Sequence, residues 1–201
     1  MKTWHEPQQT RSRARFNHIL STAEVLFAQH GYEAVTTNQI ADQSGVAIGS
    51  VYHFFPDKEA ILGALVERYA TDLQSLFPAA MTIQSDLESV AAMVIDCVIA
   101  FEQHHAAFSH FLYVLDMGKY GHIVGVIHRT VIAAIEQVVQ QVYPDMPTAL
   151  CLRYATVSFH LVKGLLPLLV TEQDAITIRL EIQTALRAYL RAFLEREGYV
   201  S

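Results

Sequence analysis

Two positions in the first third of the chain have the chemistry needed to bind an anion. Thr37 and Lys58 each stand at the expected N-terminus of a helix, where free amides and the helix dipole favour a negative charge. Lys58 adds a full positive charge to the second of these positions. Between them in the sequence, Tyr52 can direct its hydroxyl to a phosphate oxygen while its ring packs on the protein. These three side chains predict contacts to phosphate groups, which fix the register of a nucleic acid without reading its sequence.

The elements that must position these side chains are short helices. Between Phe16 and Phe27 the apolar residues recur every three or four positions, which predicts one face of a helix that Gly31 ends. The run Thr36-Thr37-Asn38-Gln39 places a hydroxyl three residues before a glutamine. This capping-box pattern opens a second helix that is expected to reach about Gln43.

A tight turn leads from the second helix into a third. Gly45 is the residue best able to turn the chain there, because glycine tolerates positive φ, and the third helix is expected from about Ile48 to Phe54. Pro56 ends it, since the residue before a proline is pushed out of the helical region. Asp57 can cap a fourth helix that reaches about Phe77. Two short helices joined by a glycine-containing turn, with a helix before them, form a helix-turn-helix arrangement.

The third helix begins with small or apolar residues. In a helix-turn-helix the N-terminal residues of the second helix face the base edges, and here they are Ala47, Ile48, Gly49 and Ser50. None of them can make the bidentate contacts that Arg, Gln or Asn make with guanine or adenine. We therefore hypothesise that Ala47 and Ile48 read thymine methyl groups, with polar contacts from Ser50 and His53. Asn38, at the start of the preceding helix, is a candidate for an adenine contact.

Residues 19–62 strongly resemble the N-terminal DNA-binding domain of the TetR family of bacterial transcriptional regulators. The matching features are Leu26-Phe27 before Gly31-Tyr32, the helix start Thr36-Thr37, Ile40-Ala41, Gly45-Val46, the run Gly49-Ser50-Val51-Tyr52, the paired aromatics before Pro56, and Lys58-Glu59. The resemblance covers about a quarter of the chain, and beyond residue 62 only length and helix content are similar. It implies a phosphate contact by Tyr52, whereas spacing alone would favour a plain core aromatic there.

The charges of the chain support a polyanion partner at one end only. The net charge is −6, but the first twenty residues carry Lys2, Arg11, Arg13 and Arg15 against the single acid Glu6. Residues 1–15 are expected to form a basic arm that reaches the DNA backbone or minor groove, although a short basic run is as often a solvated tail. The predicted DNA-binding residues are Thr36, Thr37, Asn38, Ala47, Ile48, Gly49, Ser50, Tyr52, His53 and Lys58, together with Arg11, Arg13 and Arg15.

The remaining chain has the helical period almost throughout, which predicts an all-α fold. Helices are expected at about 86–104, 107–117, 122–143, 147–170 and 174–197, with breaks at "MGKYG", "YPDMP" and "TEQD". A DNA-binding domain over residues 1–58 would then precede a larger helical ligand-binding and dimerisation domain over residues 59–201.

The last two expected helices have apolar stripes that could close a four-helix bundle between two chains, as in a homodimer. The equally weighted alternative is that both stripes cover the core of their own chain. The residues of the two stripes, with Leu150 at the start of the first, are Tyr154, Val157, Leu161 and Leu165, and Ile178, Ile182, Ala185, Tyr189 and Phe193.

The family resemblance also implies a small-molecule pocket in the larger domain, and a fourth helix that transmits ligand binding to the DNA-binding part. The effector is expected to be largely apolar. Ordinary core packing is the alternative explanation for any single one of the candidate residues. These candidates are Met93, Cys97, Phe101, Phe108, Phe111, Leu112, Leu115 and Phe159.

Other functions find no support in the sequence. With 52% hydrophobic and 17% charged residues the chain is globular, and no apolar run is long and uncharged enough to suggest a membrane span. Cys97 and Cys151 lack metal-site spacing and indicate a reducing cytoplasm. The histidines miss the three- or four-residue spacing of a helical metal pair, and no nucleophile motif or phosphate loop is present, so neither a cofactor nor catalysis is predicted.

The sequence therefore predicts a cytoplasmic, homodimeric regulator that binds double-stranded operator DNA, a repressor that a small-molecule effector releases. One alternative is an activator or co-repressor-dependent regulator, whose DNA affinity rises with ligand. Another is a helical small-molecule-binding protein or enzyme that no longer uses its helix-turn-helix.

Overall fold

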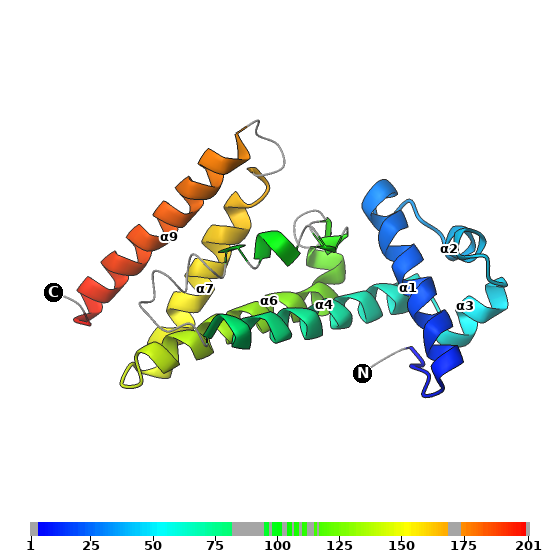
Figure 1. Ribbon diagram of the computed structural model, residues 1–201, viewed down its shortest axis with the longest axis horizontal. Helices are drawn as coiled ribbons and strands as arrows, with labels where there is room; N and C mark the ends of the chain where they lie inside the picture. Colours follow the sequence, from blue (N-terminus) through cyan, green and yellow to red (C-terminus); the bar gives the residue numbers. More distant parts are fainter. Residues whose placement is uncertain are drawn as a thin grey trace. The chain divides into compact units, whose positions relative to one another are not determined.

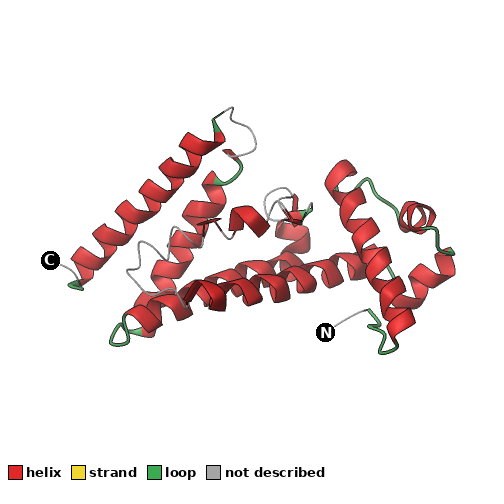
Figure 2. Ribbon diagram, viewed as in Figure 1, coloured by secondary structure: helices red, strands yellow, loops and turns green. Residues whose placement is uncertain are grey.

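The computed structural model describes residues 4–81, 95–96, 98–101, 104–105, 107–108, 110–111, 115, 117–168 and 174–199. Helices and short connections account for these residues (Figures 1 and 2), so the predicted all-α fold class is confirmed. The helices are α1 (Thr10–His30), α2 (Thr37–Ser44), α3 (Ile48–Phe54), α4 (Lys58–Met81), α6 (Met117–Val142), α7 (Thr148–Leu165) and α9 (Ala175–Glu197).

Local signals set the ends of the short helices as predicted. Thr36 caps α2, its side chain accepting a hydrogen bond from the amide of Gln39, and the glutamine side chain returns to the Thr36 amide. Gly45 ends α2 in the left-handed conformation, with φ 64° and ψ 28°. At the start of α4 the Asp57 carboxylate accepts the Ala60 amide over 2.7 Å. These contacts confirm the predicted capping box, turn and cap.

The first helix begins earlier than its apolar period suggests. Phe16 is its first buried apolar side chain, but α1 already starts at Thr10. Arg11, Arg13 and Arg15 therefore lie on the first turns of a helix, and the prediction that residues 1–15 form an arm is wrong for them. The run after Pro7 contains arginine and alanine, which are good helix formers, so the helix extends beyond the part that packs on the core.

The helix α6 also differs from the prediction. The expected break "MGKYG" lies inside it, because α6 begins at Met117. Tyr120 is buried and its ring packs on Tyr32, with ring centroids 5.0 Å apart. This tertiary contact outweighs the roughly 1 kcal/mol that each glycine costs in a helix. The break at "YPDMP" is confirmed between α6 and α7.

Other predicted boundaries are only partly covered by the structure. The helix α7 ends at Leu165, short of the expected residue 170. Asp174 caps α9, accepting the Thr177 amide over 3.1 Å, while the rest of the "TEQD" break lies outside the described residues. Most of the expected helix at 86–104 and part of the one at 107–117 also lie outside them.

The chain divides into two compact units. Unit 1 comprises residues 1–71 and 102–127, and unit 2 comprises residues 72–101 and 128–201. Residues 102–127 thus belong with the helix-turn-helix, although they come much later in the sequence. The proposed domain boundary at residue 58 stays a prediction.

Aromatic side chains form much of the core of each unit. In unit 1 Phe111 packs on Phe27 and Tyr69, with ring centroids 6.0 and 5.9 Å apart. In unit 2 Tyr154 stacks on Tyr189 at 5.6 Å and packs on Phe193 at 5.4 Å.

The predicted dimer stripes are partly wrong. Tyr154, Ile182 and Phe193 are buried within their own unit, so these three cannot form a surface. Tyr154 and Phe193 belong to one hydrophobic cluster of unit 2 and Ile182 to another. These three side chains therefore cover the core of their own chain, which is the alternative that the sequence left open. Of the other stripe residues, Val157 and Ala185 are exposed, and Leu161, Leu165, Ile178 and Tyr189 are half-buried.

The helix α6 is long and rich in apolar residues. By length and composition alone, Gly118–Val142 could cross a membrane. However, Tyr120, Val124 and Ile127 are buried in unit 1, and Val138 and Val139 belong to the core of unit 2. Such packing is that of a core helix.

Candidate nucleic-acid interface

The helix α3 has one buried and one exposed face. Val51 and Phe54 are buried, whereas Ile48, Tyr52 and His53 are exposed, Tyr52 to 50%. Ala47 and Gly49 are also exposed, and Ser50 is half-buried. The residues predicted to contact bases therefore lie on one solvent-accessible face.

Aromatic rings hold α3 on α1. The ring of Phe16 in α1 lies 5.8 Å from that of Phe54 and 4.8 Å from that of Phe55. Both phenylalanines are almost completely buried. Of the four consecutive residues 52–55, Tyr52 and His53 are therefore exposed and the two phenylalanines lie in the core.

The N-terminus of α2 contacts the exposed face of α3. The hydroxyls of Thr37 and Tyr52 lie 3.2 Å apart, so two of the three predicted phosphate ligands are brought together. Next to them is an open cavity of about 320 Å³. Its lining residues are Glu33, Val35, Thr36, Thr37, Tyr52, Pro56, Asp57 and Lys58. Asn38 is exposed on the first turn of α2.

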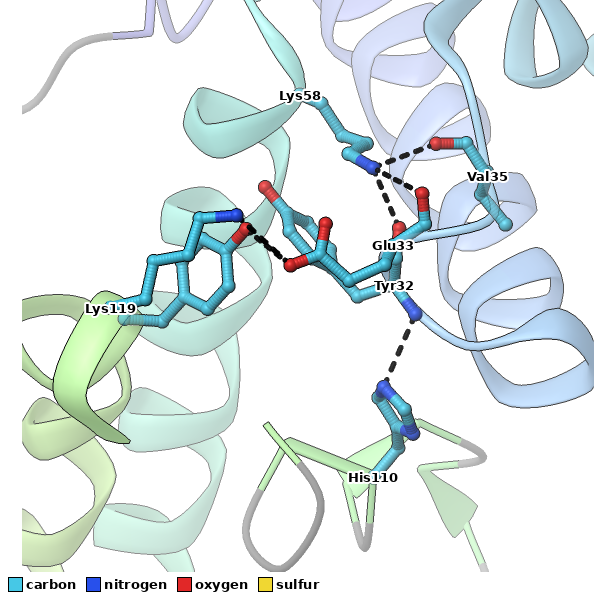
Figure 3. Close-up of polar contacts among 7 residues, drawn as sticks. Tyr32, Glu33, Val35, Lys58, His110 and Lys119 are labelled. Atoms are coloured by element: carbon cyan, nitrogen blue, oxygen red, sulfur yellow. Dashed lines mark hydrogen bonds and ion pairs between the residues drawn. The ribbon is translucent and has the colours of Figure 1, made fainter. Parts of the chain in front are cut away.

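The ammonium group of Lys58 is engaged within the protein (Figure 3). It donates hydrogen bonds to the carbonyl oxygens of Tyr32, Glu33 and Val35 over 2.7, 3.2 and 2.9 Å. An ammonium has three donors, so all of them are used. Burial lowers the pKa of Lys58, while the nearby Glu33 opposes that shift. A phosphate contact would require Lys58 to release a carbonyl, so its role in this structure is to hold the α1–α2 turn, residues 31–35.

The opposite side of the α1–α2 turn is held by α6 and by His110 (Figure 3). The Glu33 carboxylate accepts hydrogen bonds from Tyr120 Oη at 2.8 Å and Lys119 Nζ at 3.1 Å. These two bonds lower the pKa of Glu33. The amide of Tyr32 donates to His110 Nε2 over 3.2 Å, and burial lowers the pKa of that imidazole. Sequence reasoning missed these residues because their partners are 78 to 87 positions away.

A buried carboxylate joins α1 to α4. Glu24 Oε1 accepts a hydrogen bond from Tyr69 Oη over 2.6 Å, and Glu24 Oε2 forms an ion pair with Arg68. His105 Nδ1 lies 3.5 Å from the same carboxylate. Burial, followed by the charge of Glu24, raises the pKa of Tyr69. The sequence held a signal for this cluster, since Glu24 falls on the core-facing stripe of α1, four residues after Leu20.

The N-terminal segment is attached to α3 and α4. The His5 amide donates to the Phe54 carbonyl over 2.8 Å, which satisfies an acceptor at the C-terminal end of α3. A Cβ on Gly63 of α4 would come within 2.8 Å of the Trp4 ring, so only glycine allows this approach. Arg11, Arg13 and Arg15 are exposed on α1, and Arg13 Nε donates to the Pro7 carbonyl over 3.4 Å.

The predicted ligand-pocket residues are only partly described. Phe108 and Phe111 are buried in unit 1, each with its ring centroid 5.9 Å from that of Tyr69. Phe101 and Leu115 are also buried, and Phe159 packs on His128 with ring centroids 5.0 Å apart. Met93, Cys97 and Leu112 lie outside the described residues. These contacts are those of core side chains, and the pocket stays a prediction.

Comparison with known proteins gives two family matches. Residues 19–65 match the model of bacterial regulatory proteins of the tetR family, and residues 86–190 match that of the tetracyclin repressor-like C-terminal domain. Among curated proteins the chain is similar to the HTH-type transcriptional repressor KstR2 of Rhodococcus jostii (strain RHA1), with 32% identity over 96 residues, 46% of each chain. It is also similar to the HTH-type transcriptional regulator YxaF of Bacillus subtilis (strain 168), with 41% identity over 69 residues, 34% of this chain and 36% of YxaF. The matched part thus spans less than half the length of these relatives.

Solved structures share the fold over most of the chain. The fatty acid degradation regulator FadR from Bacillus halodurans has a TM-score of 0.72 at 15% identity, covering 86% of this chain and 94% of FadR. FadR from Bacillus subtilis in complex with stearoyl-CoA has a TM-score of 0.67 at 16% identity, with 85% and 97% covered. The SmeT–triclosan complex has a TM-score of 0.70 at 21% identity, with 89% and 91% covered.

Proposed function

Because the chain belongs to the TetR family of bacterial regulatory proteins, we propose that it is a repressor of transcription that a small-molecule effector releases from its operator. The single observation that carries the proposal is the exposed face of α3 beside the N-terminus of α2, with Thr37 and Tyr52 in contact. As a member of a family of regulators the chain is not an enzyme. A regulator of bacterial transcription works in the cytoplasm.

On DNA, α3 would enter the major groove and α2 would lie across the backbone. With Thr37 donating to Tyr52, the Tyr52 hydroxyl would donate to a phosphate oxygen, and the N-terminus of α2 at Thr37 would favour the same anion. Thr36 and Asn38 would lie close to the same strand. Ala47 and Ile48 would contact thymine methyls, with Gly49 allowing a close approach of the backbone. Ser50 and His53 would give polar contacts, and Arg11, Arg13 and Arg15 would attract the backbone from α1.

A homodimer would present two such helices. Two recognition helices must lie about 34–36 Å apart to enter successive major grooves. Exposed apolar side chains of α7 and α9 support a self-complementary surface in unit 2, because exposed apolar patches mark protein–protein interfaces. These side chains are Leu152, Val157, Ile176 and Leu180.

The effector would be largely apolar, and the candidate pocket residues that lie in unit 1 are Phe108, Phe111 and Leu115. Two structures of the same fold contain stearoyl-CoA and triclosan, molecules with large apolar parts, which supports this class. An effector releases DNA only to the extent that it binds more tightly to the conformation that does not bind DNA than to the one that does. A complete switch needs a difference of roughly 5.5 kcal/mol between these two binding free energies. An activator whose DNA affinity rises with ligand remains the alternative mode of regulation.

The proposal is tested by selecting an operator from a pool of random DNA duplexes. We expect an enriched palindromic sequence with thymine opposite α3, and an affinity for it that falls when Ile48 is replaced by Ser. Val25→Ser is the matched control, because Val25 is an exposed apolar residue of α1 with similar exposure. A pool without any enriched sequence would overturn the proposal and favour a binding protein that no longer uses its helix-turn-helix.

A further inference from the structure

A cluster of basic side chains in unit 2 lies around Phe159, one of the phenylalanines predicted to line the effector pocket. This basic cluster comprises His128, His160 and Lys163. We infer that it is a subsite for an anionic group of the effector, which is then an amphipathic monoanion such as a carboxylate with an aromatic or aliphatic part. The inference rests on the proposed function and narrows its effector, which was so far described only as largely apolar.

His128 brings an unused polar atom to the cluster. Its Nε2 is buried and has no hydrogen-bond partner in the part of the chain that the structure describes. Nearly all buried polar atoms of folded proteins have a partner, so an orphaned one requires an explanation. A ligand oxygen that accepts a hydrogen bond from Nε2 would supply the missing partner.

Phe159 gives the cluster an apolar surface. Its ring centroid lies 5.0 Å from that of His128 and 5.2 Å from that of His160, and its side chain is 6% exposed. Since His128 belongs to α6 and Phe159 to α7, the two helices meet here. Ligand sites combine aromatic side chains of this kind with a few polar groups that fix the orientation of the ligand.

Lys163 adds a partly buried positive charge. It follows Phe159 by four residues, which places the two side chains on the same face of α7. Lys163 is half-buried, and burial lowers its pKa. The dipole of α7 favours a positive charge near the C-terminus of the helix, but it does not explain why an ammonium group is partly withdrawn from water.

The positive charges of the cluster are not neutralised by ion pairs among the described residues. Burial and then the charges of Lys163, His160 and Arg129 lower the pKa of His128, so positive charge gathers around this imidazole. The described ion pairs of unit 2 are formed by other cations, which are Arg153, Arg179, Arg191 and Arg196. A bound anion would therefore be stabilised at this place.

The charges of the cluster select the class of ligand. One ammonium group, beside an imidazole that can donate a hydrogen bond, matches a single negative charge. A cationic ligand would be repelled by Lys163. A neutral ligand would leave its half-buried ammonium without a counter-ion from the described part of the chain. The ring of Phe159 would contact the apolar part of the ligand.

Two dyes with the same aromatic skeleton test the inference without knowledge of the effector. Anilinonaphthalene sulfonate carries one negative charge, whereas phenylnaphthylamine is neutral, and both fluoresce more strongly in an apolar site. The whole chain is titrated with each dye in the absence of DNA. We expect Lys163→Met to weaken binding of the sulfonate about tenfold, and binding of the neutral dye by no more than about twofold.

Three further variants separate the charge from other effects of substitution. His128→Leu should weaken binding of the sulfonate about fivefold, because the donor at Nε2 is lost. Lys163→Arg keeps the positive charge and should bind the sulfonate within about threefold of the wild type. Arg187→Met is the matched control, since it removes one positive charge from an exposed position of α9 and should leave both affinities unchanged.

Competition shows whether the site takes an amphipathic anion or any anion. Decanoate should displace the sulfonate dye at a concentration about tenfold lower than decanol does, because only decanoate has a carboxylate. Inorganic phosphate should not displace it in the same range, since it has no apolar part. Displacement by inorganic phosphate as effective as by decanoate would overturn the inference that the ligand is amphipathic.

Thermal unfolding checks that each variant is folded, and Lys163→Gln takes the place of Lys163→Met if the methionine variant is not. The inference is overturned if the wild type does not bind the sulfonate dye, if removing the charge of Lys163 leaves that affinity unchanged, or if Arg187→Met weakens it equally. Failure of the proposed function is seen separately, as absence of sequence-specific DNA binding by the wild type without dye.

Discussion

Thr37 and Tyr52 meet through their hydroxyl groups, whose oxygens lie 3.2 Å apart. The contact joins the first residue of α2 to the exposed face of α3 across a separation of fifteen residues. It fixes the orientation of a tyrosine that is half exposed and would otherwise choose among several rotamers. Because each hydroxyl has a single donor, the contact leaves one of the two free to donate to the DNA backbone, and we expect this to be the Tyr52 hydroxyl.

Removing the Tyr52 hydroxyl should weaken DNA binding without altering sequence preference. Tyr52→Phe loses one hydrogen bond to phosphate, which is worth about 1–2 kcal/mol, or roughly tenfold in affinity. The loss should be similar for operator and unrelated duplexes, because phosphate contacts carry no sequence information. Fluorescence anisotropy with both duplexes checks this. Tyr199→Phe, a tyrosine that packs on Tyr143 in unit 2, is the control and should bind as the wild type does.

Replacing Lys58 should affect folding as well as DNA binding. Lys58→Met leaves three carbonyls of the α1–α2 turn without their donor, and we expect a loss of about 2–3 kcal/mol in the free energy of unfolding. Urea denaturation measures it. If Lys58 served only as a phosphate contact, stability would be unchanged and only the salt dependence of DNA binding would fall.

The carboxylate of Glu24 should be necessary for the stability of unit 1. Glu24→Leu leaves Arg68 partly buried without its ion pair and Tyr69 without its acceptor, which should cost roughly 3 kcal/mol in chemical denaturation. Glu24→Leu/Arg68→Met should recover most of this loss, because the uncompensated charge is gone. Equal stability of the two variants would contradict the account.

Protonation of His128 should destabilise the fold at acid pH. Burial, with the positive charges of Lys163, His160 and Arg129, lowers the pKa of His128 from 6.5 to about 4. Between these values the unfolded chain binds a proton that the folded chain does not, so stability falls as the pH drops from 6.5 towards 4. His128 is only half-buried, so solvent screening limits the effect to about 1–2 kcal/mol.

His128→Leu isolates this contribution. The buried Nε2 has no hydrogen-bond partner among the residues that the structure describes, so an apolar side chain of similar size loses no such bond there. Thermal unfolding of the variant should depend less on pH between 6.5 and 4 than that of the wild type. Identical pH profiles would show that His128 does not titrate as described.

Features predicted correctly from the sequence depend on neighbours in the chain. The capping box of Thr36 and Gln39 spans three residues, and the left-handed turn depends on Gly45 alone. The family resemblance then placed the exposed residues of α3 together. Such signals can be recognised without the fold, because the interacting atoms are close in the sequence.

Features that sequence reasoning missed depend on distant partners. Lys58 was predicted to bind phosphate, because the carbonyls that accept hydrogen bonds from its ammonium group lie 23 to 26 residues away in the sequence. Tyr120 was expected in a break between helices, because glycines stand on both sides of it. The contact with Tyr32 that stabilises a helix there cannot be recognised from the sequence. The buried stripe of Tyr154, Ile182 and Phe193 could equally have faced a second chain, since periodicity identifies an apolar face but not what covers it.

The most direct test of the central claim is a salt titration of DNA binding by fluorescence anisotropy, with the selected operator and a scrambled duplex of the same length. We expect the operator to bind about 10³-fold or more tightly than the scrambled duplex, and log K for both to fall linearly with log salt concentration. Equal affinity for the two duplexes, without salt dependence, would contradict it.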